Sequence, residues 1–290
     1  MHLGRRLGFG AAVIAAVVLP SAVVRESSII ARHLRLSWRV LWALTVIECR
    51  RKYAGSILGM LWYPLYSALL LGCYCFVYMV IFHARFKELG TYEYVLFVFA
   101  GLIPFLGLSE AISTSTQSVR QSLAILRNAV FPIEFVPVKT VGAALFGLTS
   151  SLAILIAMTA PTSHAGWHFL YLPVAVAGLT TFCVMTAWIL SATAVVVPDL
   201  VQVVNIALML LMFVSPVGYS ISGSGIPASA RFLLYLNPLT YLIDMFRFAI
   251  LGIRDLPFWV DPMFLASAVA ATALAGTFFR SVAPIFSDYE

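Results

Sequence analysis

Apolar runs of about 20 residues follow one another along most of the chain, separated by short charged or turn-forming segments. A helix of this length crosses the hydrocarbon of a bilayer. Typical boundaries are residues 83–88 after the first run and Pro198-Asp199 after the fourth. The pattern predicts an all-α integral membrane protein whose transmembrane domain, residues 57–290, has six spans near 58–82, 93–115, 138–160, 170–196, 201–220 and 261–281.

An amphipathic segment precedes the first run. Its apolar residues recur at helical spacing, at Ile30, Leu34, Leu41, Leu44 and Ile47. Its cations share one side of the helix, at Arg32, Arg35 and Arg39. We expect an interface helix over 27–56, either a plain surface anchor or a gate. Residues 1–26 are interpreted as an N-terminal extension on the inner leaflet, with an extra span or a secretory signal as the alternatives.

Two further segments are too short or too polar to span. Residues 117–130 predict a short helix closed by Phe131-Pro132, and a helix docking a cytoplasmic partner over about 121–136 fits better than a solvated linker. Near the other end, Asn237-Pro238 begins a helix that stops at Gly252. That helix contains Asp244 and Arg247, so it is expected to be re-entrant or interfacial within an outer helix pair over about 226–256, or a surface helix on the headgroups.

Composition supports lipid as the main solvent, because 62% of the residues are apolar and only 10% are charged. The net charge of +6 occurs without a long basic tract, which favours anionic lipid over nucleic acid as its partner. Most cations fall in segments that are inside if the N-terminus is inside, which predicts two cytoplasmic termini. The four cysteines are scattered, so we expect neither a metal site nor a disulfide.

Candidate chemistry begins at the mouth of the first span. Arg50, Arg51 and Lys52, followed by Tyr53, either fix the depth of the helix or attract an anionic lipid head. Behind them, at 100° per residue, Tyr63, Tyr66, Tyr74 and Tyr78 fall within an arc of about 120°. Buried phenols need hydrogen-bond partners or a wet cavity. The stripe therefore either bonds to neighbouring helices or lines a path for a polar, ring-shaped cargo such as sugars.

The stretch "RRKYAGSILGMLWYPL" resembles the start of the membrane subunit of type-2 ABC exporters of polysaccharides, the family that carries O-antigen, capsule and teichoic acid chains. Trp62 completes the family's basic-Tyr-x-x-Ser-x-Leu-Gly-x-x-Trp pattern. The similarity continues in the family's order over roughly residues 30–290, through "YVLFVFAGLIPFLGLSEAI", "ILRNAVFPIEFVPVKTV", "VPDLVQVVNIALMLLMFVSPVGY" and "LNPLTYLIDMFRFAILG". Pro198-Asp199 departs from the usual Arg-Asp pair after the fourth span.

This resemblance implies a homodimer that works with two ABC ATPase subunits in the cytoplasmic membrane and exports a glycan on an undecaprenyl-type lipid. It implies an inner gate ending in Arg50, Arg51, Lys52 and Tyr53. Beside this gate, the tyrosine stripe itself favours a sugar channel along Trp62, Tyr63, Tyr66, Tyr74 and Tyr78. The resemblance also implies a coupling helix with Arg120, Arg127, Phe131, Pro132 and Glu134, and an outer gate with Asn237, Pro238, Asp244 and Arg247.

Absent motifs restrict the chemistry. The sequence has no G-x-x-x-x-G-K-[ST] loop, so ATP and Mg²⁺ are expected on a partner ATPase, and the chain itself is expected to be a channel subunit without a cofactor or catalytic residues. An exporter of drugs or small lipids, and a membrane glycosyltransferase acting on a lipid carrier, are the alternatives. A secondary transporter would carry paired intramembrane charges, whereas Glu110 is the one acid expected within a span, as a hydrogen-bonded structural group.

Overall fold

A computed structural model of the chain describes residues 38–81, 90–126, 132–162, 166–221 and 228–288. Helices joined by short turns make up these residues, and no strand occurs among them, which confirms the all-helical prediction for this part of the chain. The α-helices are α3 (Trp38–Lys52), α4 (Trp62–Cys75), α5 (Thr91–Thr116), α6 (Ser118–Leu126), α7 (Phe135–Thr159), α8 (Leu172–Val196), α9 (Leu200–Val214), α10 (Ala228–Leu236), α11 (Pro238–Leu251) and α12 (Val260–Val282). Shorter turns are the 3₁₀ helices η1 (Gly59–Leu61), η3 (Trp167–Tyr171) and η4 (Ala283–Asp288) and the π-helix η2 (Phe76–Ile81).

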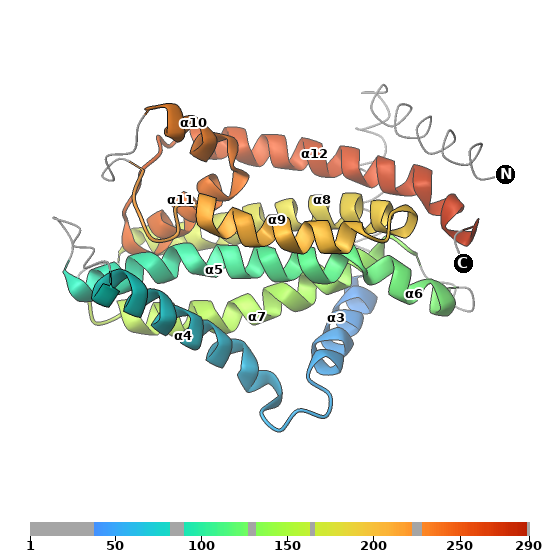
Figure 1. Ribbon diagram of the computed structural model, residues 1–290, viewed down its shortest axis with the longest axis horizontal. Coiled ribbons are helices and arrows are strands. Elements are labelled where there is room, and N and C mark those ends of the chain that lie inside the picture. The colour runs from blue at the N-terminus through green and yellow to red at the C-terminus, as the bar shows by residue number, and fades with distance from the viewer. Residues whose placement is uncertain (1–37, 82–89, 127–131, 163–165, 222–227, 289–290) are drawn as a thin grey trace.

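The long helices lie side by side along the long axis of the molecule, with α5 at the centre (Figure 1). α5 contacts α4, α7, α8, α9 and α11, and every residue from Leu96 to Phe105 is buried. A helix that is apolar on all sides is stable only when other helices or lipid surround it. α5 is therefore the core around which the remaining helices are arranged.

Among the described residues, four helical segments are long and apolar enough to cross a membrane: Thr91–Thr116, Phe135–Thr159, Trp167–Val196 and Val260–Phe286. They match the second, third, fourth and sixth predicted spans. The first and fifth predicted spans contain the shorter apolar helices Gly59–Cys73 and Leu200–Val214. The multi-pass prediction is thus supported by four clear spans.

The helix in the fifth predicted span is shorter than the sequence predicts. We expected a helix to residue 220, but α9 ends at Val214. Ser215 is extended, with φ −78° and ψ 144°, because it precedes Pro216 and the proline ring disfavours the helical conformation of the residue before it. The chain then turns, and the carbonyls of Pro216 and Val217 in this turn accept hydrogen bonds from Arg247 of α11.

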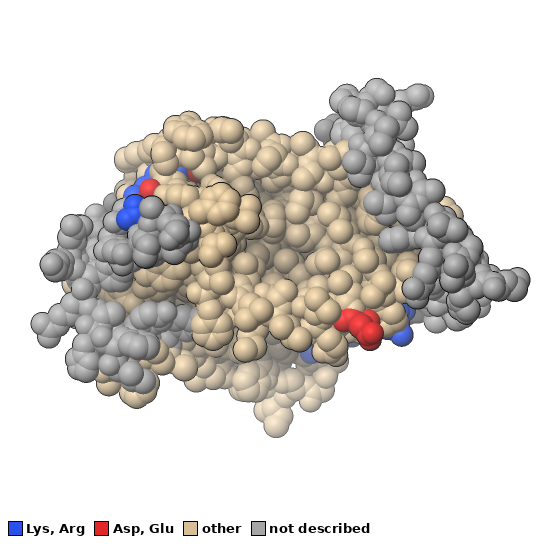
Figure 2. Space-filling model, turned by 45° about the horizontal axis from the view of Figure 1, so that its top comes forward, with Lys and Arg blue, Asp and Glu red and all other residues tan. Residues whose placement is uncertain are grey.

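On the face drawn in Figure 2, the described charged residues lie near two edges. A broad uncharged band lies between them. A lipid-facing surface has this form, because a charge at the centre of a bilayer costs about 2.5 kcal/mol or more.

α3 crosses the direction of α5, α7 and α12 instead of running alongside them (Figure 1). It ends at Lys52, not at the expected boundary near residue 56, and Gly55 turns the chain with φ 82°. Its buried face is formed by Leu41, Thr45 and Cys49 against α7, whereas Ile47 is exposed. Contact with α7 thus selects an i, i+4, i+8 row of α3, and the amphipathic interface helix stays a prediction. Residues 27–37 lie outside the described part of the chain.

α11 begins and ends where the sequence predicted. The Asn237 side chain accepts a hydrogen bond from the Leu239 amide at 3.0 Å, and Gly252 closes the helix with φ 70°. Only a residue without a Cβ adopts that left-handed conformation at little cost. From Leu242 to Leu251 every residue is buried, and α11 contacts α5, α8 and η3. The alternative of a helix resting on the headgroups is therefore wrong: α11 is enclosed by protein.

Candidate functional site: a polar, aromatic cavity beside the end of α3

A cavity of about 460 Å³ lies where the end of α3 meets α4, α5 and α7. Its lining combines aromatic rings with polar groups, namely Tyr53, Trp62, Tyr63 and Tyr66 together with Lys52, Ser67, Ser109, Glu110, Ser113, Thr114 and Ser151. Some of these hydroxyl groups are bonded within the bundle, as Ser67 and Ser151 are to each other at 2.6 Å, but a hydroxyl that donates one bond still accepts others. Together with the exposed Tyr66 side chain they form a wall along which a polar ligand or water can bind.

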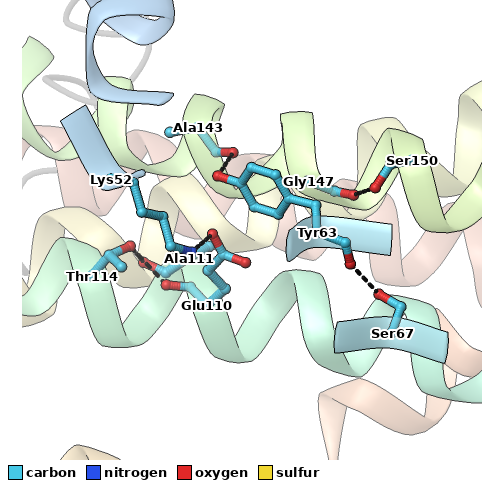
Figure 3. A network of polar contacts seen from close by, with 9 residues as sticks. All are labelled: Lys52, Tyr63, Ser67, Glu110, Ala111, Thr114, Ala143, Gly147 and Ser150. Carbon is cyan, nitrogen blue, oxygen red and sulfur yellow. Dashed lines mark hydrogen bonds and ion pairs between the residues drawn. The ribbon is translucent and has the colours of Figure 1, made fainter. Parts of the chain in front are cut away.

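An ion pair joins two elements at this cavity. Lys52, the last residue of α3, reaches Glu110 on α5, with 2.5 Å between Nζ and Oε1 (Figure 3). The same Nζ lies 5.0 Å from the centroid of the Tyr63 ring and 5.5 Å from that of Tyr53. Glu110 is thus a hydrogen-bonded group, as predicted, and its partner fixes the end of α3 to the central helix.

The tyrosines of the predicted stripe have different environments. Tyr63 is only 6% exposed, and its hydroxyl donates to the Ala143 carbonyl at 3.4 Å. Tyr66 is 55% exposed and lines the cavity without a hydrogen bond to any described residue. The side chains of Tyr74 and Tyr78 lie outside the described part of the structure. The stripe therefore begins with one phenol bonded to a neighbouring helix and one open to the cavity.

The helix geometry changes at the far end of the predicted stripe. The chain passes from α4 to a π-helix at Phe76, and a π-helix has more residues per turn, so each residue advances by a smaller angle than the 100° of an α-helix. The common arc therefore stays a prediction for Tyr74 and Tyr78.

Tyr63 rests on Gly147 of α7, where an added Cβ would overlap the Tyr63 ring. We expect Gly147→Ala to lower the free energy of unfolding by about 1 kcal/mol, because overpacking exceeds the gain in helix propensity. Thermal unfolding of the purified protein in detergent measures this. Gly72→Ala in α4 is the matched control, since nothing lies within 4 Å of its added Cβ. Equal midpoints for both variants would contradict the close contact.

A smaller polar cavity of about 190 Å³ adjoins the first and shares Lys52, Glu110 and Thr114 with it. Here Glu48 of α3 pairs with Arg51 at 2.7 Å and with Lys139 of α7 at 3.1 Å. The contact between Glu48 and Arg51 follows from their spacing of three residues on one helix. Sequence reasoning missed Lys139, because no local pattern links it to α3.

The three consecutive cations have three environments. Arg51 and Lys52 are held by Glu48 and Glu110. Arg50 is exposed, makes no ion pair with any described residue, and lines a separate groove against α7 and α8.

Burial raises the pKa of the neighbouring Tyr53 above its ordinary value, against the opposing effect of Lys52, so the phenol remains a neutral hydrogen-bond donor.

The predicted coupling segment is described in part. Arg120 is exposed on α6, whereas Arg127 and Phe131 lie outside the described residues. Pro132 is exposed, and Glu134 pairs with Arg280 of α12 at 3.2 Å. The Glu134 carbonyl also accepts a hydrogen bond from Trp188 at 3.1 Å. The chain that follows α6 is thereby attached to α8 and α12 at its return into α7.

The four predicted outer residues lie together on α11, but Asp244 and Arg247 do not bond to each other. Asp244 accepts from the Asp255 amide at 2.7 Å and lies 3.4 Å from Arg254, which in turn pairs with Asp261 at 2.5 Å. Burial raises the pKa of Asp244 to about 6, although the Asp255 amide and Arg254 oppose the shift. Arg254 and Asp261 were not identified from the sequence, since each lies outside α11.

Arg247 holds the turn that follows α9. Its guanidinium donates to the carbonyls of Pro216 and Val217 at 2.7 Å and of Tyr219 at 3.3 Å, and lies 3.5 Å from the centroid of the Phe97 ring. These contacts join α11, the turn after α9 and the central helix α5 to one another.

Comparison with known proteins agrees with this architecture. The sequence pattern of the ABC-2 type transporter family matches residues 39–251, from α3 to the end of α11. This chain belongs to the ABC-2 type transporter family. Membership makes it a multi-pass membrane transport subunit and not an enzyme, as the sequence predicted, and the alternative of a glycosyltransferase is set aside.

Two relatives within this family are close enough to align over most of their length. The O-antigen export system permease protein RfbA of Myxococcus xanthus is 27% identical over 252 residues, which cover 86% of this chain and 94% of the relative. A protein of the same name from Klebsiella pneumoniae is 22% identical over 211 residues, 72% of this chain and 78% of that relative.

Proposed function

We propose that two copies of this chain form the channel of an ATP-driven exporter that moves a lipid-linked polysaccharide out across the cytoplasmic membrane. The names of the two relatives support a polysaccharide of the O-antigen class as the cargo. The observation that carries the proposal is the cavity beside α3, which offers four aromatic side chains and several hydroxyl groups within a membrane-embedded bundle.

The chemistry of this cavity suits a sugar chain. Aromatic rings cover the apolar faces of sugar rings, and neutral phenols exchange hydrogen bonds with their hydroxyl groups. Tyr66 is free for such contacts, whereas Lys52 brings a cation to the cavity wall, where it is paired with Glu110. An anionic pyrophosphate head that carries the glycan would exchange with Glu110 for this cation. A drug or small-lipid exporter has less use for the hydroxyl groups.

A second copy has apolar surface on which to associate. On α9, Val203, Ile206, Met209, Leu210 and Phe213 are all more than half exposed. They recur at three and four residues, so they lie along one side of the helix. Lipid or a partner helix must cover this side, and association of two copies through α9 closes a channel between them. The proposed oligomer is therefore a homodimer.

Six spans and a cytoplasmic coupling face complete the arrangement. η1, α4 and η2 follow one another without a break from Gly59 to Ile81, which supports a first span, and α9 supplies a shortened fifth. α6 and the end of α12 lie at the same end of the molecule (Figure 1). From the positive-inside bias of the sequence we assign this end to the cytoplasm and expect both chain termini on the cytoplasmic side. There the ATPase docks on residues 121–136, and α10 and α11 form a re-entrant outer gate.

Deleting the gene tests the cargo directly. Cells without this chain are expected to lose polysaccharide from their surface and to accumulate the lipid-linked glycan on the cytoplasmic side of the membrane. The full-length chain is expected to co-purify with an ABC ATPase in equal numbers. Unchanged surface polysaccharide, together with export of a small lipid or drug by the purified complex, would establish the alternative exporter.

Replacing Tyr66 with leucine tests the channel wall. We expect export to fall about tenfold, because one ring and one hydroxyl contribute roughly 1.4 kcal/mol of contact with the passing sugars. Tyr66→Phe is expected to lose less, since it keeps the ring. Phe76→Leu is the matched control, because Phe76 is equally exposed on the same segment but does not line the cavity. Quantifying surface polysaccharide in complemented cells gives the readout, and equal loss in the Tyr66→Leu and Phe76→Leu strains would argue against a sugar path at Tyr66.

A further inference from the structure

A second, apolar groove runs along the other side of α3. It has a volume of about 400 Å³ and lies between α3, α7 and α8. Its walls include Val46 on α3 and Leu145 and Phe146 on α7, and it shares no lining residue with the polar cavity. The groove is therefore separate from the proposed sugar path.

Apart from Arg50 and two indoles, the groove offers few groups that a polar ligand can bond. Three threonines line it, but each hydroxyl is already bonded to a carbonyl of its own helix: Thr45 to Leu41 at 2.9 Å, Thr149 to Phe146 at 2.6 Å and Thr180 to Val176 at 2.7 Å. A sugar in this place would leave its hydroxyl groups without partners, which is costly away from water. A hydrocarbon chain loses nothing there.

Among the described residues that line the groove, Arg50 alone is charged. Arg50 lines it and has no acidic partner among the described residues, whereas its neighbours Arg51 and Lys52 are paired on the opposite side of α3. A guanidinium presents a planar fork of donors that matches two phosphate oxygens. The indoles of Trp38 and Trp42 are mostly exposed at the same groove, as aromatic side chains at the level of lipid headgroups are.

We infer that this groove binds an anionic glycerophospholipid of the inner leaflet, with one acyl chain along α7 and the phosphate on Arg50. The cation of Arg50 suits the phosphate of such a lipid, and the apolar walls of the groove suit its acyl chain. The polyprenyl carrier of the proposed cargo is a poorer fit, because its glycan must enter the polar cavity on the far side of α3. The bound lipid would hold α3 against α7 while the cargo passes on the other side.

Lipid retention by the purified full-length chain tests this inference without any export assay. Native mass spectrometry counts the phosphatidylglycerol and phosphatidylethanolamine molecules that stay bound after incubation in detergent. We expect Arg50→Gln to retain about fivefold less phosphatidylglycerol, the factor that corresponds to one cation beside an anionic surface, with little change in phosphatidylethanolamine. Arg51→Gln is the matched control, because it removes the same charge from the adjacent residue, whose side chain lines the smaller polar cavity instead. It is expected to retain phosphatidylglycerol as the wild type does.

A second variant fills the groove without changing charge. Thr149→Trp is expected to reduce retention of both phospholipids, since the indole occupies the path of the acyl chain. Equal loss from Arg50→Gln and Arg51→Gln would show a general charge effect and overturn the inference. A wild-type protein that retains no phosphatidylglycerol would also overturn the inference, and this result is expected if residues before Trp38 fill the groove. A wild-type protein that retains a polyprenyl lipid, with release of that lipid by Arg50→Gln, would overturn it as well. These outcomes leave the export proposal standing, because they concern only the lipid at α3.

Discussion

Arg247→Met is expected to reduce the free energy of unfolding by roughly 3 kcal/mol, enough to shift the folded-to-unfolded ratio more than a hundredfold. Arg247 is 3% exposed and donates to three carbonyls of the turn after α9. Burial lowers the pKa of its guanidinium to about 10, so it remains charged at neutral pH. Methionine fills much of the volume, but it removes the donor from the buried carbonyls of Pro216 and Val217 and from the partly buried carbonyl of Tyr219.

The measurement is the amount of folded chain in the membrane, followed by the thermal midpoint of the purified protein. The thermal midpoint of Arg247→Lys is expected to lie between those of the wild type and Arg247→Met. The lysine ammonium keeps the charge, but its compact head cannot reproduce the planar fork of donors of a guanidinium. Arg120→Met is the matched control, since Arg120 is exposed on α6. A midpoint for Arg247→Met as high as that of Arg120→Met would show that the turn after α9 does not depend on this arginine.

Lys52→Glu is expected to weaken the attachment of α3 to α5 by roughly 2 kcal/mol and to lower export about thirtyfold. The change replaces an ion pair at 2.5 Å with two facing carboxylates. Two unit charges 4 Å apart near a protein surface interact with about 4 kcal/mol. The side chains of Lys52 and Glu110 are 37% and 25% exposed, so solvent screens part of this energy.

A charge exchange separates this ion pair from a general need for lysine. Glu110→Lys alone is expected to impair export as strongly, because it opposes Lys52, whereas the double variant Lys52→Glu with Glu110→Lys restores most of it. Arg51→Glu is the control on the same turn of α3, where an exposed pair with Glu48 is worth little. Export of surface polysaccharide and ATPase activity of the complex are the readouts. No rescue in the double variant would refute a role for the pairing itself.

Local sequence patterns were enough to predict the bounds of a helix that begins at a capping residue and ends at a glycine. α11 is the clearest case, because an asparagine cap, a proline in the first turn and a glycine in the left-handed conformation each act within a few residues. α9 shows the limit of the same reasoning. Its apolar run continues past Val214, and only the effect of Pro216 on Ser215 ends the helix.

Contacts between distant residues were beyond reach. The sequence drew attention to Lys52 and Glu110 separately, but they are 58 positions apart and no periodicity joins them. Arg247 is a similar case, since its partners are backbone carbonyls, which every residue carries and no sequence pattern marks. The three consecutive cations looked equivalent, yet successive residues on a helix point about 100° apart, so they reach different neighbours.

Composition and hydrophobic periodicity by themselves determined that this protein is a helical bundle in lipid, because a bilayer imposes its thickness and polarity on any chain that crosses it. Motif order determined the family to which it belongs. Tertiary structure alone decided which phenol is open to the polar cavity, which cation is left to the apolar groove and which carbonyls Arg247 holds. Those choices depend on how helices distant in sequence approach one another, and that approach is set by the shapes of all their side chains together.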